Sequence, residues 1–571
     1  MSIAAALATA ALDAQRSWRR RTSITLALFL LAALAPLVAG DPRTVDLANG
    51  LYLACAAVAL AFVVGVTGLP LLAQGAYVAI GAIVGAHLLA HGTPTLAAAL
   101  AGGVAGGLVG GLSGLAFARL PRAGFAAATW ILAWLVALAA DSISWVIGGS
   151  EGTLVQRGPT PIVHYELALA LTGLAALGFT ALARAPFGLR LAAAREREAA
   201  ARELGAPVDR LRMIAVALAG TVAGVTGALS VELAGVADPA AYGPYLSFKL
   251  FVVVLVGGAV APLGAPVGVV VLGVLSVAAD AIGSIENVAA SRAHTLLAAI
   301  MLLGLISLGW EGLLRPARRT RVARGTAPER PAAVRLTASG IGKQYGELVA
   351  VDSISIEASP GTITALVGPN GSGKTTVLRM LAGSVRPDAG TITGSSRATR
   401  TPQATAVFPQ LTTLEHLLVG SAVRRRHGGA LRSLCSTPKH RAEDAAFTAE
   451  GEQILQRFGL LPDTRASELD TAEQRALMLA SAYATGASVL LVDEPTAGAS
   501  ATETARIIEL LRWLREQGLA LVVVEHNLGV VRELADTVLV LDAGRMIAHG
   551  SPDVVAADER VQTAFLGRQV L

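Results

Sequence analysis

Charged residues are scarce in this sequence. Asp, Glu, Lys and Arg make up only 15% of its 571 residues, against roughly 25% in soluble domains. The shortage is uneven, because residues 22–310 are dominated by Ala, Leu, Val and Gly, whereas charged residues become frequent after Glu311. This contrast argues against a wholly soluble protein and predicts a membrane half followed by a soluble half.

Cysteine and lysine are also rare. The two cysteines, Cys55 in an apolar stretch and Cys435 in the soluble half, cannot form a disulfide framework and indicate no metal site. Because lysine is so scarce, the formal net charge of +5 comes almost wholly from arginine. We attribute this arginine-dominated, alanine-rich usage to genome composition and predict no nucleic-acid partner.

Apolar runs of membrane length recur through the first half. The run 22–39 follows an arginine-rich arm at residues 16–21. A cleaved signal peptide is one interpretation, but the later runs favour an uncleaved first membrane helix. Since roughly 20 apolar residues span a bilayer, the sequence predicts about eight to ten transmembrane helices. The further candidate segments are 47–67, 71–90, 95–118, 124–147, 165–183, 213–235, 246–261, 265–283 and 292–310.

The positions of the arginines predict the orientation. A cytoplasmic N-terminus followed by ten crossings places Arg119, Arg122, the segment 184–212 and everything after Trp310 in the cytoplasm. These are the arginine-rich segments, so the count agrees with the preference of basic loops for the cytoplasmic side.

Glycine is dense inside the apolar spans. The glycines between Gly102 and Gly114 fall close to the small-xxx-small spacing that permits close approach of helices. Helix breaks at 65–70 and 257–266 lie in corresponding places of two halves. They predict an inverted repeat around a central pathway, although glycines used only for packing would give the same pattern. The few acidic residues in the spans lie near predicted ends, and we interpret them as interfacial carboxylates, with a proton relay as the alternative; they include Asp141, Glu232 and Asp280.

A glycine-rich loop is the first motif in the soluble half that indicates a chemical function. It lies between an apolar strand at 363–367 and a helix, which is the context of a phosphate-binding P-loop. Its backbone N–H groups and the helix N-terminus would bind the phosphates of ATP. Lys374 would reach the β- and γ-phosphates, and the Thr375 hydroxyl would bind Mg²⁺. The loop residues are Gly368, Pro369, Asn370, Gly371, Ser372, Gly373, Lys374, Thr375 and Thr376.

Two acids follow another buried strand, 489–492. Asp493 would hold Mg²⁺, and Glu494 would orient or deprotonate the attacking water, since phosphoryl transfer needs such groups beside the γ-phosphate. His526 follows the next apolar strand, where it could contact the γ-phosphate. Tyr345 precedes a β-rich segment and could stack on adenine; an ordinary core aromatic is the alternative.

The longest cytoplasmic segment, 184–212, contains a short charged helix that ends at Gly205. A solvated loop helix is one interpretation. However, the segment resembles the coupling loop of the permeases that import branched-chain amino acids. Glu198, Ala199 and Ala200, followed by Gly205, are similar to the "EAA…G" pattern of importers. The resemblance covers most of residues 22–310 and implies a loop that docks on an ATPase.

Residues 334–571 resemble ABC ATPase domains. The resemblance implies that Gln403 links Mg²⁺ to the coupling helix. The sequence departs from the family at the signature Leu-Ser-x-Gly-Gln and again at 498–500, where Gly-Ala-Ser replaces Gly-Leu-Asp. Asp470 would place an anion where a phosphate should lie unless it caps the helix, and Ala472 would add a Cβ to a close backbone approach. The signature residues here are Leu469, Asp470, Thr471, Ala472 and Glu473.

The predicted fold is a polytopic α-helical membrane domain (1–314), a basic linker (315–333) and an α/β P-loop ABC ATPase domain (334–571). The resemblance implies ATP- and Mg²⁺-dependent import of branched-chain or related amino acids through a bacterial inner (plasma) membrane, with the ATPase cytoplasmic. Importers of urea, amides or aromatic acids in the same family are the alternative, and an exporter half-transporter or a membrane-tethered ATPase is disfavoured. The implied partners are a second permease, a second ATPase and an extracytoplasmic substrate-binding protein, and the linker could touch lipid headgroups.

Overall fold

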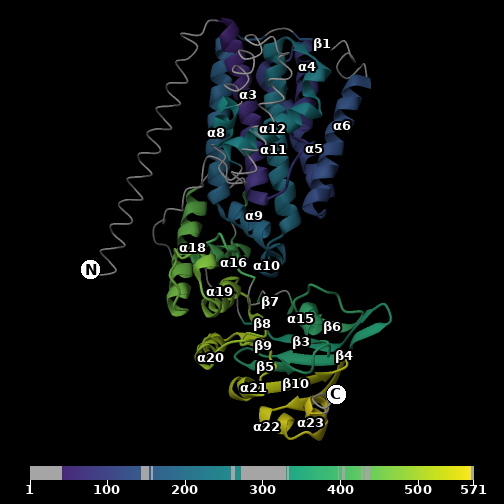
Figure 1. Cartoon of the computed structure of the whole chain (residues 1–571), viewed down its shortest axis with the longest axis vertical. Helices are drawn as coiled ribbons and strands as arrows, with labels where there is room; N and C mark the ends of the chain where they lie inside the picture. Colours follow the sequence, from purple (N-terminus) through teal and green to yellow (C-terminus); the bar gives the residue numbers. More distant parts are fainter. Residues whose placement is uncertain are drawn as a thin grey trace, which may run out of the picture. The chain divides into compact units, whose positions relative to one another are not determined.

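The computed structural model describes residues 41–142, 153–155, 158–258, 264–271, 330, 333–395, 398–401, 406–425, 429–430 and 437–566. Internal contacts divide the chain into two units (Figure 1). The helical unit comprises residues 1–191 and 209–321, and the α/β unit comprises 192–208 and 322–571. The segment 192–208 therefore belongs to the α/β unit although its neighbours in sequence belong to the helical unit.

Long apolar helices build the helical unit. Five helices in the described part are long and apolar enough to cross a membrane, and two shorter apolar helices, α4 and α12, accompany them. The predicted spans 22–39 and 292–310, and most of 265–283, lie outside the described residues, so the total number stays a prediction. The elements are α3 (Asp41–Phe62), η1 (Val63–Thr67), α4 (Gln74–Ala90), α5 (Thr95–Phe117), α6 (Arg122–Ser142), β1 (Thr153–Leu154), α8 (Pro161–Arg184), α9 (Pro186–Glu196), α11 (Val208–Ala234), β2 (Val236–Ala237), η3 (Pro239–Tyr242) and α12 (Pro244–Gly257).

Glycine lets α4, α5 and α11 approach almost to backbone contact. A Cβ added to Gly224 of α11 would lie 2.2 Å from the carbonyl oxygen of Gly102 in α5. One added to Gly106 would lie 2.4 Å from the Gly220 oxygen, and one added to Gly81 of α4 would lie 2.0 Å from the Gly224 oxygen. Any side chain at these positions would push the helices apart. The predicted close approach is confirmed.

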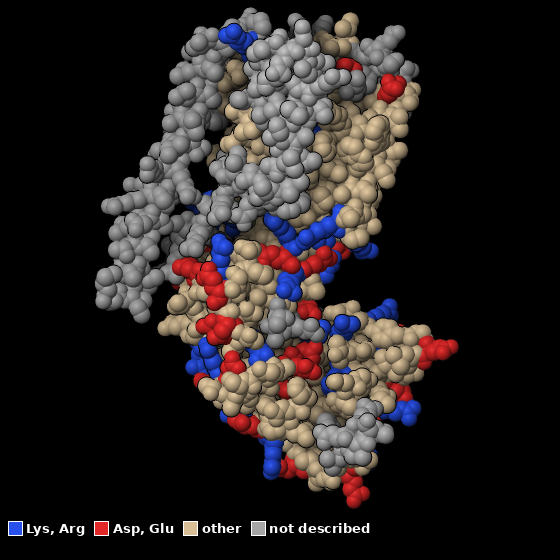
Figure 2. Space-filling model, viewed as in Figure 1, with Lys and Arg blue, Asp and Glu red and all other residues tan. Residues whose placement is uncertain are grey.

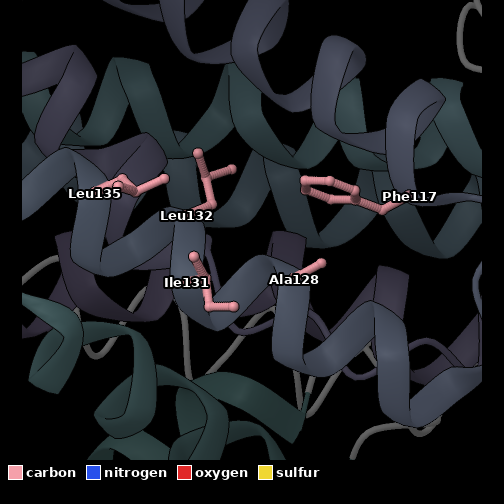
Figure 3. A pocket seen from close by; sticks show the side chains of 5 residues that line it. All are labelled: Phe117, Ala128, Ile131, Leu132 and Leu135. Carbon is pink, nitrogen blue, oxygen red and sulfur yellow. The ribbon is translucent and has the colours of Figure 1, made fainter.

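Helices α5 and α6 present an apolar face. Figure 2 shows a broad surface without charged side chains over these helices. A shallow hollow in it is lined only by apolar residues (Figure 3), namely Phe117, Ala128, Ile131, Leu132 and Leu135. The hollow offers a ligand no polar side chain, so it belongs to the apolar face rather than to a binding site.

Both predicted helix breaks are present. After η1, Gly68 adopts the left-handed conformation at φ 69°, and α12 ends at Gly257, followed by its C-cap Gly258 with φ 104°. Polar groups meet inside the unit beside the first break: Gln74 donates to the Ala56 oxygen at 3.1 Å, and the Ser247 hydroxyl accepts the Gly75 N–H at 2.9 Å. The inverted repeat itself remains a prediction.

Glu232 lies near the end of α11, as predicted, but its side chain does not face solvent. It is only 2% exposed and accepts a hydrogen bond from the Thr95 hydroxyl at 2.6 Å. Its second oxygen lies 4.0 Å from Nε2 of His164, whose Nδ1 is 3.0 Å from the Tyr52 hydroxyl. A buried polar cluster therefore holds the Glu232 side chain, and its position at the membrane interface stays a prediction. Asp141 is exposed at the end of α6, whereas Asp280 lies outside the described residues.

Two sheets form the frame of the α/β unit. One is an antiparallel sheet in the order β4-β3-β6, and the other is a six-stranded sheet in the order β11-β10-β5-β9-β8-β7. In the second sheet only β11 runs antiparallel to its neighbour. Strands β5 and β9 are buried along their whole length, as expected when helices cover both faces of a parallel sheet. The strands are β3 (Leu336–Tyr345), β4 (Leu348–Ala358), β5 (Ile363–Val367), β6 (Ala389–Thr393), β7 (Ala398–Arg400), β8 (Val489–Asp493), β9 (Ala520–Val524), β10 (Thr537–Asp542) and β11 (Arg545–Gly550).

Helices surround these sheets and form a helical layer of their own around α16, α18 and α19. They are α10 (Glu198–Glu203), α15 (Lys374–Leu381), α16 (Thr413–Ser421), η6 (Ala422–Arg424), α18 (Pro438–Arg457), η7 (Ala466–Glu468), α19 (Thr471–Ala484), α20 (Ala501–Glu516), α21 (Leu528–Leu534), α22 (Pro552–Ala556) and α23 (Glu559–Leu566).

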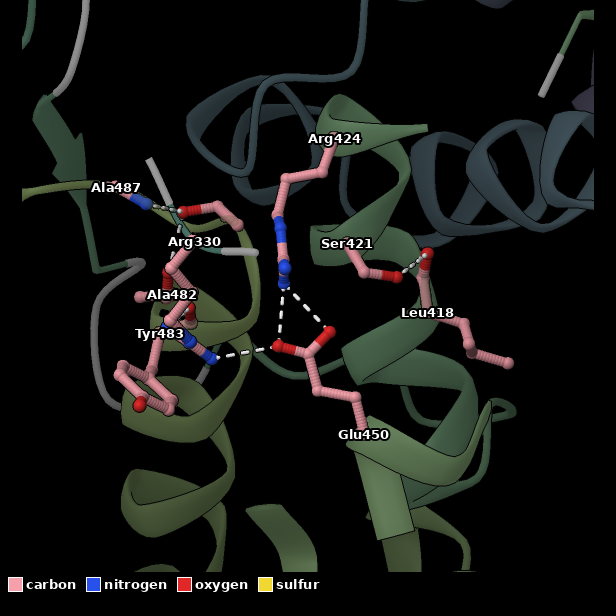
Figure 4. Close-up of polar contacts among 9 residues, drawn as sticks. Arg330, Leu418, Ser421, Arg424, Glu450, Ala482, Tyr483 and Ala487 are labelled. Atoms are coloured by element: carbon pink, nitrogen blue, oxygen red, sulfur yellow. Dashed lines mark hydrogen bonds and ion pairs between the residues drawn. The ribbon is translucent and has the colours of Figure 1, made fainter. Parts of the chain in front are cut away.

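Arg330, in the predicted linker, is held against this helical layer (Figure 4). It donates to the Tyr483 carbonyl oxygen at 3.0 Å and to Glu450 at 3.1 Å, and its guanidinium lies 3.4 Å over the Tyr483 ring. Glu450 also accepts two hydrogen bonds from Arg424, at 2.7 and 2.8 Å. The side chain of Arg330 is therefore anchored to this helical layer.

Candidate nucleotide-binding site

The order of the strands brings the predicted nucleotide-binding residues together. Strands β5, β9 and β8 are adjacent and parallel, so their carboxyl ends meet at one edge of the sheet. The P-loop follows β5, Asp493 ends β8 and His526 follows β9. This edge is where open α/β sheets bind ligands.

The P-loop curls because its glycines adopt conformations that other residues avoid. Gly371 and Gly373 have φ values of 82° and 99°, and a Cβ on Gly373 would lie 2.5 Å from the Ala350 oxygen. Lys374 begins α15, and its Nζ donates to the carbonyl oxygens of Gly368 and Pro369, both at 2.8 Å. The ammonium group thus lies across the loop, where a phosphate would be cradled.

Burial lowers the pKa of Lys374, while the charges of Glu494 and Asp493 act in the opposite direction. The Ser372 hydroxyl is buried and has no hydrogen-bond partner within the described residues. An unpaired buried hydroxyl is costly, so a phosphate oxygen at this loop would satisfy it.

The two acids after β8 differ in environment. The Asp493 carboxylate is nearly buried and accepts a hydrogen bond from Arg400 Nη2 at 2.7 Å. Glu494 has a left-handed backbone, φ 45°, and its N–H donates to the Val524 oxygen at 2.9 Å. Such a conformation costs a non-glycine residue about 1–3 kcal/mol and occurs most often at functional sites.

These residues fit a magnesium ion. The exposed Thr375 and the Asp493 carboxylate offer one hydroxyl and one carboxylate oxygen. Magnesium in nucleotide sites takes one or two such ligands and completes its shell with phosphate and water oxygens. The described residues contain no group of three or more His, Cys, Asp or Glu that could hold a metal without a ligand. A Mg²⁺ site completed by nucleotide phosphates does not require such a group.

His526 extends from the end of β9, and its side chain is 59% exposed. The adjoining Glu525 points inward and is only 1% exposed. One Glu525 oxygen accepts the N–H and the hydroxyl of Thr496 at 2.9 and 2.6 Å, and the other accepts the His526 N–H at 3.2 Å. Sequence reasoning missed Glu525, although an acid directly after a wholly apolar strand was a usable signal.

Tyr345 ends β3 and is 46% exposed, with Lys343 Nζ 5.6 Å from its ring centroid. The alternative that Tyr345 is a core aromatic is therefore wrong. An exposed ring remains available for stacking on a base.

Residues 192–208, the middle of the predicted coupling segment 184–212, pack within the α/β unit. Glu196 accepts the Gln410 N–H at 3.0 Å, and Glu203 accepts a hydrogen bond from Arg400 at 3.1 Å. Gly205 has φ 83°, and a Cβ there would lie 2.7 Å from the Val423 side chain.

Within this segment Ala200 is buried, Ala199 is exposed, and Glu198 forms an ion pair with Arg202 at 2.8 Å. Gln403 lies outside the described residues. Glu196, Glu203 and Arg400 were not predicted, because their pairing depends on how distant segments fold together.

Comparison with known proteins assigns the family. The family described as "Branched-chain amino acid transport system / permease component" matches residues 47–328. The families "ABC transporter" and "Branched-chain amino acid ATP-binding cassette transporter" match 351–497 and 545–570. The high-affinity branched-chain amino acid transport ATP-binding protein LivG of Salmonella typhimurium is 32% identical over 249 residues, 41% of this chain and 97% of LivG. The chain belongs to the branched-chain amino acid family of ABC transporters.

Further comparisons cover the same half. LivG of Escherichia coli K12 is also 32% identical over 41% of this chain and 97% of its own length. A solved nucleotide-free ATP-binding cassette from an ABC transporter is 26% identical, with a TM-score of 0.35, over 40% of this chain and 98% of its own. The family assignment confirms the predicted fold class, a permease fused to an ABC ATPase.

At the position of the family signature, Asp470 is the N-cap of α19. Its side chain accepts the Glu473 N–H at 2.8 Å, and Glu473 accepts the Asp470 N–H at 3.1 Å, which makes a capping box. Of the two environments considered for Asp470, the structure shows the helix cap. Leu469 and Ala472 are buried and Thr471 is exposed. The Ala472 side chain is only 8% exposed in this chain, and its effect on a close backbone approach stays a prediction.

Proposed function

We propose that this chain is the fused permease and ATPase subunit of an importer that carries a branched-chain or related amino acid across a bacterial plasma membrane. ATP hydrolysis in the cytoplasmic α/β unit drives the transport. The observation that supports the proposal is that one polypeptide combines a branched-chain permease match at 47–328 with a P-loop, Asp493 and His526 at adjacent strand ends of the α/β unit.

The proposed roles follow from position. Lys374 exchanges its two loop carbonyl contacts for phosphate oxygens, and Tyr345 stacks on adenine. Thr375, Asp493 and Gln403 hold Mg²⁺, which when bound neutralises charge on the β- and γ-phosphates. Glu494 orients or deprotonates the attacking water, and His526 contacts the γ-phosphate from the end of β9.

We further propose that the working complex is asymmetric. In ABC dimers each nucleotide lies between the P-loop of one subunit and the signature of the other. Here the P-loop follows β5 and Glu494 follows β8, but the N-terminus of α19 already holds the Asp470 carboxylate, which accepts the N–H of Glu473. A phosphate there would meet a like charge and fewer free donors.

It follows that the complete site combines this P-loop with an intact signature on a different ATPase. A second permease and an extracytoplasmic substrate-binding protein complete the assembly, and surrounding lipid covers the apolar face of α5 and α6. A homodimer of this chain would have two impaired sites.

The alternatives are an importer of urea, amides or small organic or aromatic acids, and an exporter or tethered ATPase that needs no binding protein. The test is ATPase activity of the purified complex in nanodiscs with the binding protein encoded beside it. Stimulation by the binding protein loaded with leucine, isoleucine or valine supports the proposal. Stimulation only by urea, amides or aromatic acids supports the other importers, and full activity without the binding protein overturns import.

A further inference from the structure

Arg400 lies between two carboxylates that are far apart in sequence. Its Nη1 donates to Glu203 at 3.1 Å and its Nη2 donates to Asp493 at 2.7 Å. The Arg400 side chain is 7% exposed, Asp493 is 10% exposed and Glu203 is 22% exposed. Glu203 belongs to residues 192–208 of the predicted coupling segment, whereas Asp493 ends the strand next to β9 at the P-loop edge of the sheet. One guanidinium therefore joins the coupling segment to the proposed Mg²⁺ ligand.

The backbone around this arginine is fixed. Arg400 pairs with Leu491 of β8, two residues before Asp493, and the next residue, Thr401, donates its N–H to the Leu491 oxygen at 2.9 Å. The side chain therefore starts from a rigid position on the strand adjacent to Asp493. An arginine fork of this kind can hold two carboxylates at once, which a lysine ammonium does less well.

Glu203 depends on this contact. Burial raises the pKa of Glu203, and the charge of Arg400 is the main opposing influence, with Arg379 contributing less. Glu198, the other acid of α10, is engaged by Arg202. Removing Arg400 from Glu203 would leave a half-buried carboxylate poorly compensated, and such a charge is costly.

We infer that Arg400 is a positioning residue that sets the availability of Asp493 for Mg²⁺ according to whether Glu203 is docked. Arg400 and Mg²⁺ are alternative partners for one oxygen of Asp493. With Glu203 docked, the guanidinium is shared and Asp493 is released more easily. With Glu203 withdrawn, the guanidinium stays on Asp493 and opposes the metal. By linkage, Mg²⁺–nucleotide binding strengthens the docking of the coupling segment by the same factor.

This inference rests on the proposed role of Asp493, and the test separates the two. The full-length chain in nanodiscs is titrated with a fluorescent ATP analogue, first in EDTA and then at increasing Mg²⁺. Binding of the analogue in EDTA shows whether the chain is folded and its P-loop is intact. The Mg²⁺ concentration that gives half of the change in analogue binding, called the half-effect concentration, measures how readily Asp493 accepts the metal. This measurement does not require hydrolysis. The variants are Glu203→Gln, Arg400→Gln, their double mutant, and Arg400→Lys alone and with Glu203→Gln. Glu357→Gln, which removes an exposed ion pair with Arg335, is the matched control.

Glu203→Gln is expected to raise the half-effect Mg²⁺ concentration about tenfold, with binding in EDTA unchanged. In the Arg400→Gln and Arg400→Lys backgrounds, the same substitution should change it less than about twofold. An equal effect of Glu203→Gln in all backgrounds, or none in the wild-type background, would overturn the inference. If the wild-type chain binds the analogue without any influence of Mg²⁺, the role of Asp493 in the proposed function fails instead.

Discussion

Removing the buried carboxylate of Glu525 should loosen the edge of the sheet that carries the nucleotide site. Glu525→Ala leaves three donors without their acceptor: the N–H and hydroxyl of Thr496 and the N–H of His526. A hydrogen bond to a charged group contributes about 1.5–3 kcal/mol, and a stranded buried donor costs about 1–3 kcal/mol. The Thr496 hydroxyl can rotate to another acceptor, but its backbone N–H cannot. We therefore expect a local loss of about 2–4 kcal/mol.

Hydrogen exchange of the full-length chain measures this loss where it occurs. Peptides covering 490–500 and 520–530 should lose protection by a factor of at least about thirty, since about 1.4 kcal/mol corresponds to tenfold. Glu525→Gln, which keeps one acceptor oxygen, should lose less exchange protection than Glu525→Ala. Glu533→Ala, which removes an exposed ion pair with Arg512, should change nothing in these peptides. Unchanged protection in Glu525→Ala would refute the reasoning, because the three hydrogen bonds would then contribute no net stability.

Three further predictions follow from named contacts. Glu494→Gln should retain ATP binding but slow hydrolysis by about a hundredfold or more, because a positioned general base contributes that much; a native hydrolysis rate in the partnered complex would remove Glu494 from catalysis. Gly224→Ala should reduce the yield of folded chain in detergent, because its Cβ would lie 2.2 Å from the Gly102 oxygen. Gly111→Ala is the control and should leave the yield unchanged, because its Cβ would meet nothing nearer than 3.5 Å. Equal yields from the two variants would contradict the close packing. His416 is buried and accepts the Phe408 N–H at 2.8 Å, and burial lowers its pKa to about 4. Its stabilising contribution is therefore present above the unfolded pKa of about 6.5 and is lost as the pH falls toward 4. The free energy of opening of residues 406–421, obtained from hydrogen exchange corrected for intrinsic rates, should be lower by about 2 kcal/mol at pH 5 than at pH 7.5. If His416→Phe showed the same decrease, groups other than His416 would be its cause.

Local patterns predicted which segments meet at the sheet edge, because the P-loop, Asp493 and His526 each follow directly from a short apolar strand. The P-loop needs only a strand, glycines and a helix start, and Asp493 needs only the end of an apolar strand. The resemblance to importers indicated the docking of 192–208, but not the contacts that make it. The pairing of Glu203 with Arg400 joins residues that are 197 apart in sequence, and no local pattern encodes it.

The sequence was also insufficient where one residue has two possible environments. Asp470 could face a phosphate or cap its helix, and only the capping box with Glu473 decides between them. Glu232 lies near a helix end, which suggested an interface, but its burial depends on Thr95, His164 and Tyr52 from three other helices.

The most direct test of the account is vectorial transport by the purified complex in proteoliposomes. Radiolabelled leucine and the binding protein are supplied outside, and ATP with Mg²⁺ is enclosed, on the side expected to face the α/β unit. The account predicts accumulation of leucine above its external concentration, suppressed by unlabelled isoleucine or valine and abolished by Glu494→Gln. Accumulation that survives Glu494→Gln in this chain, or leucine movement out of the vesicles on the addition of ATP, would contradict it.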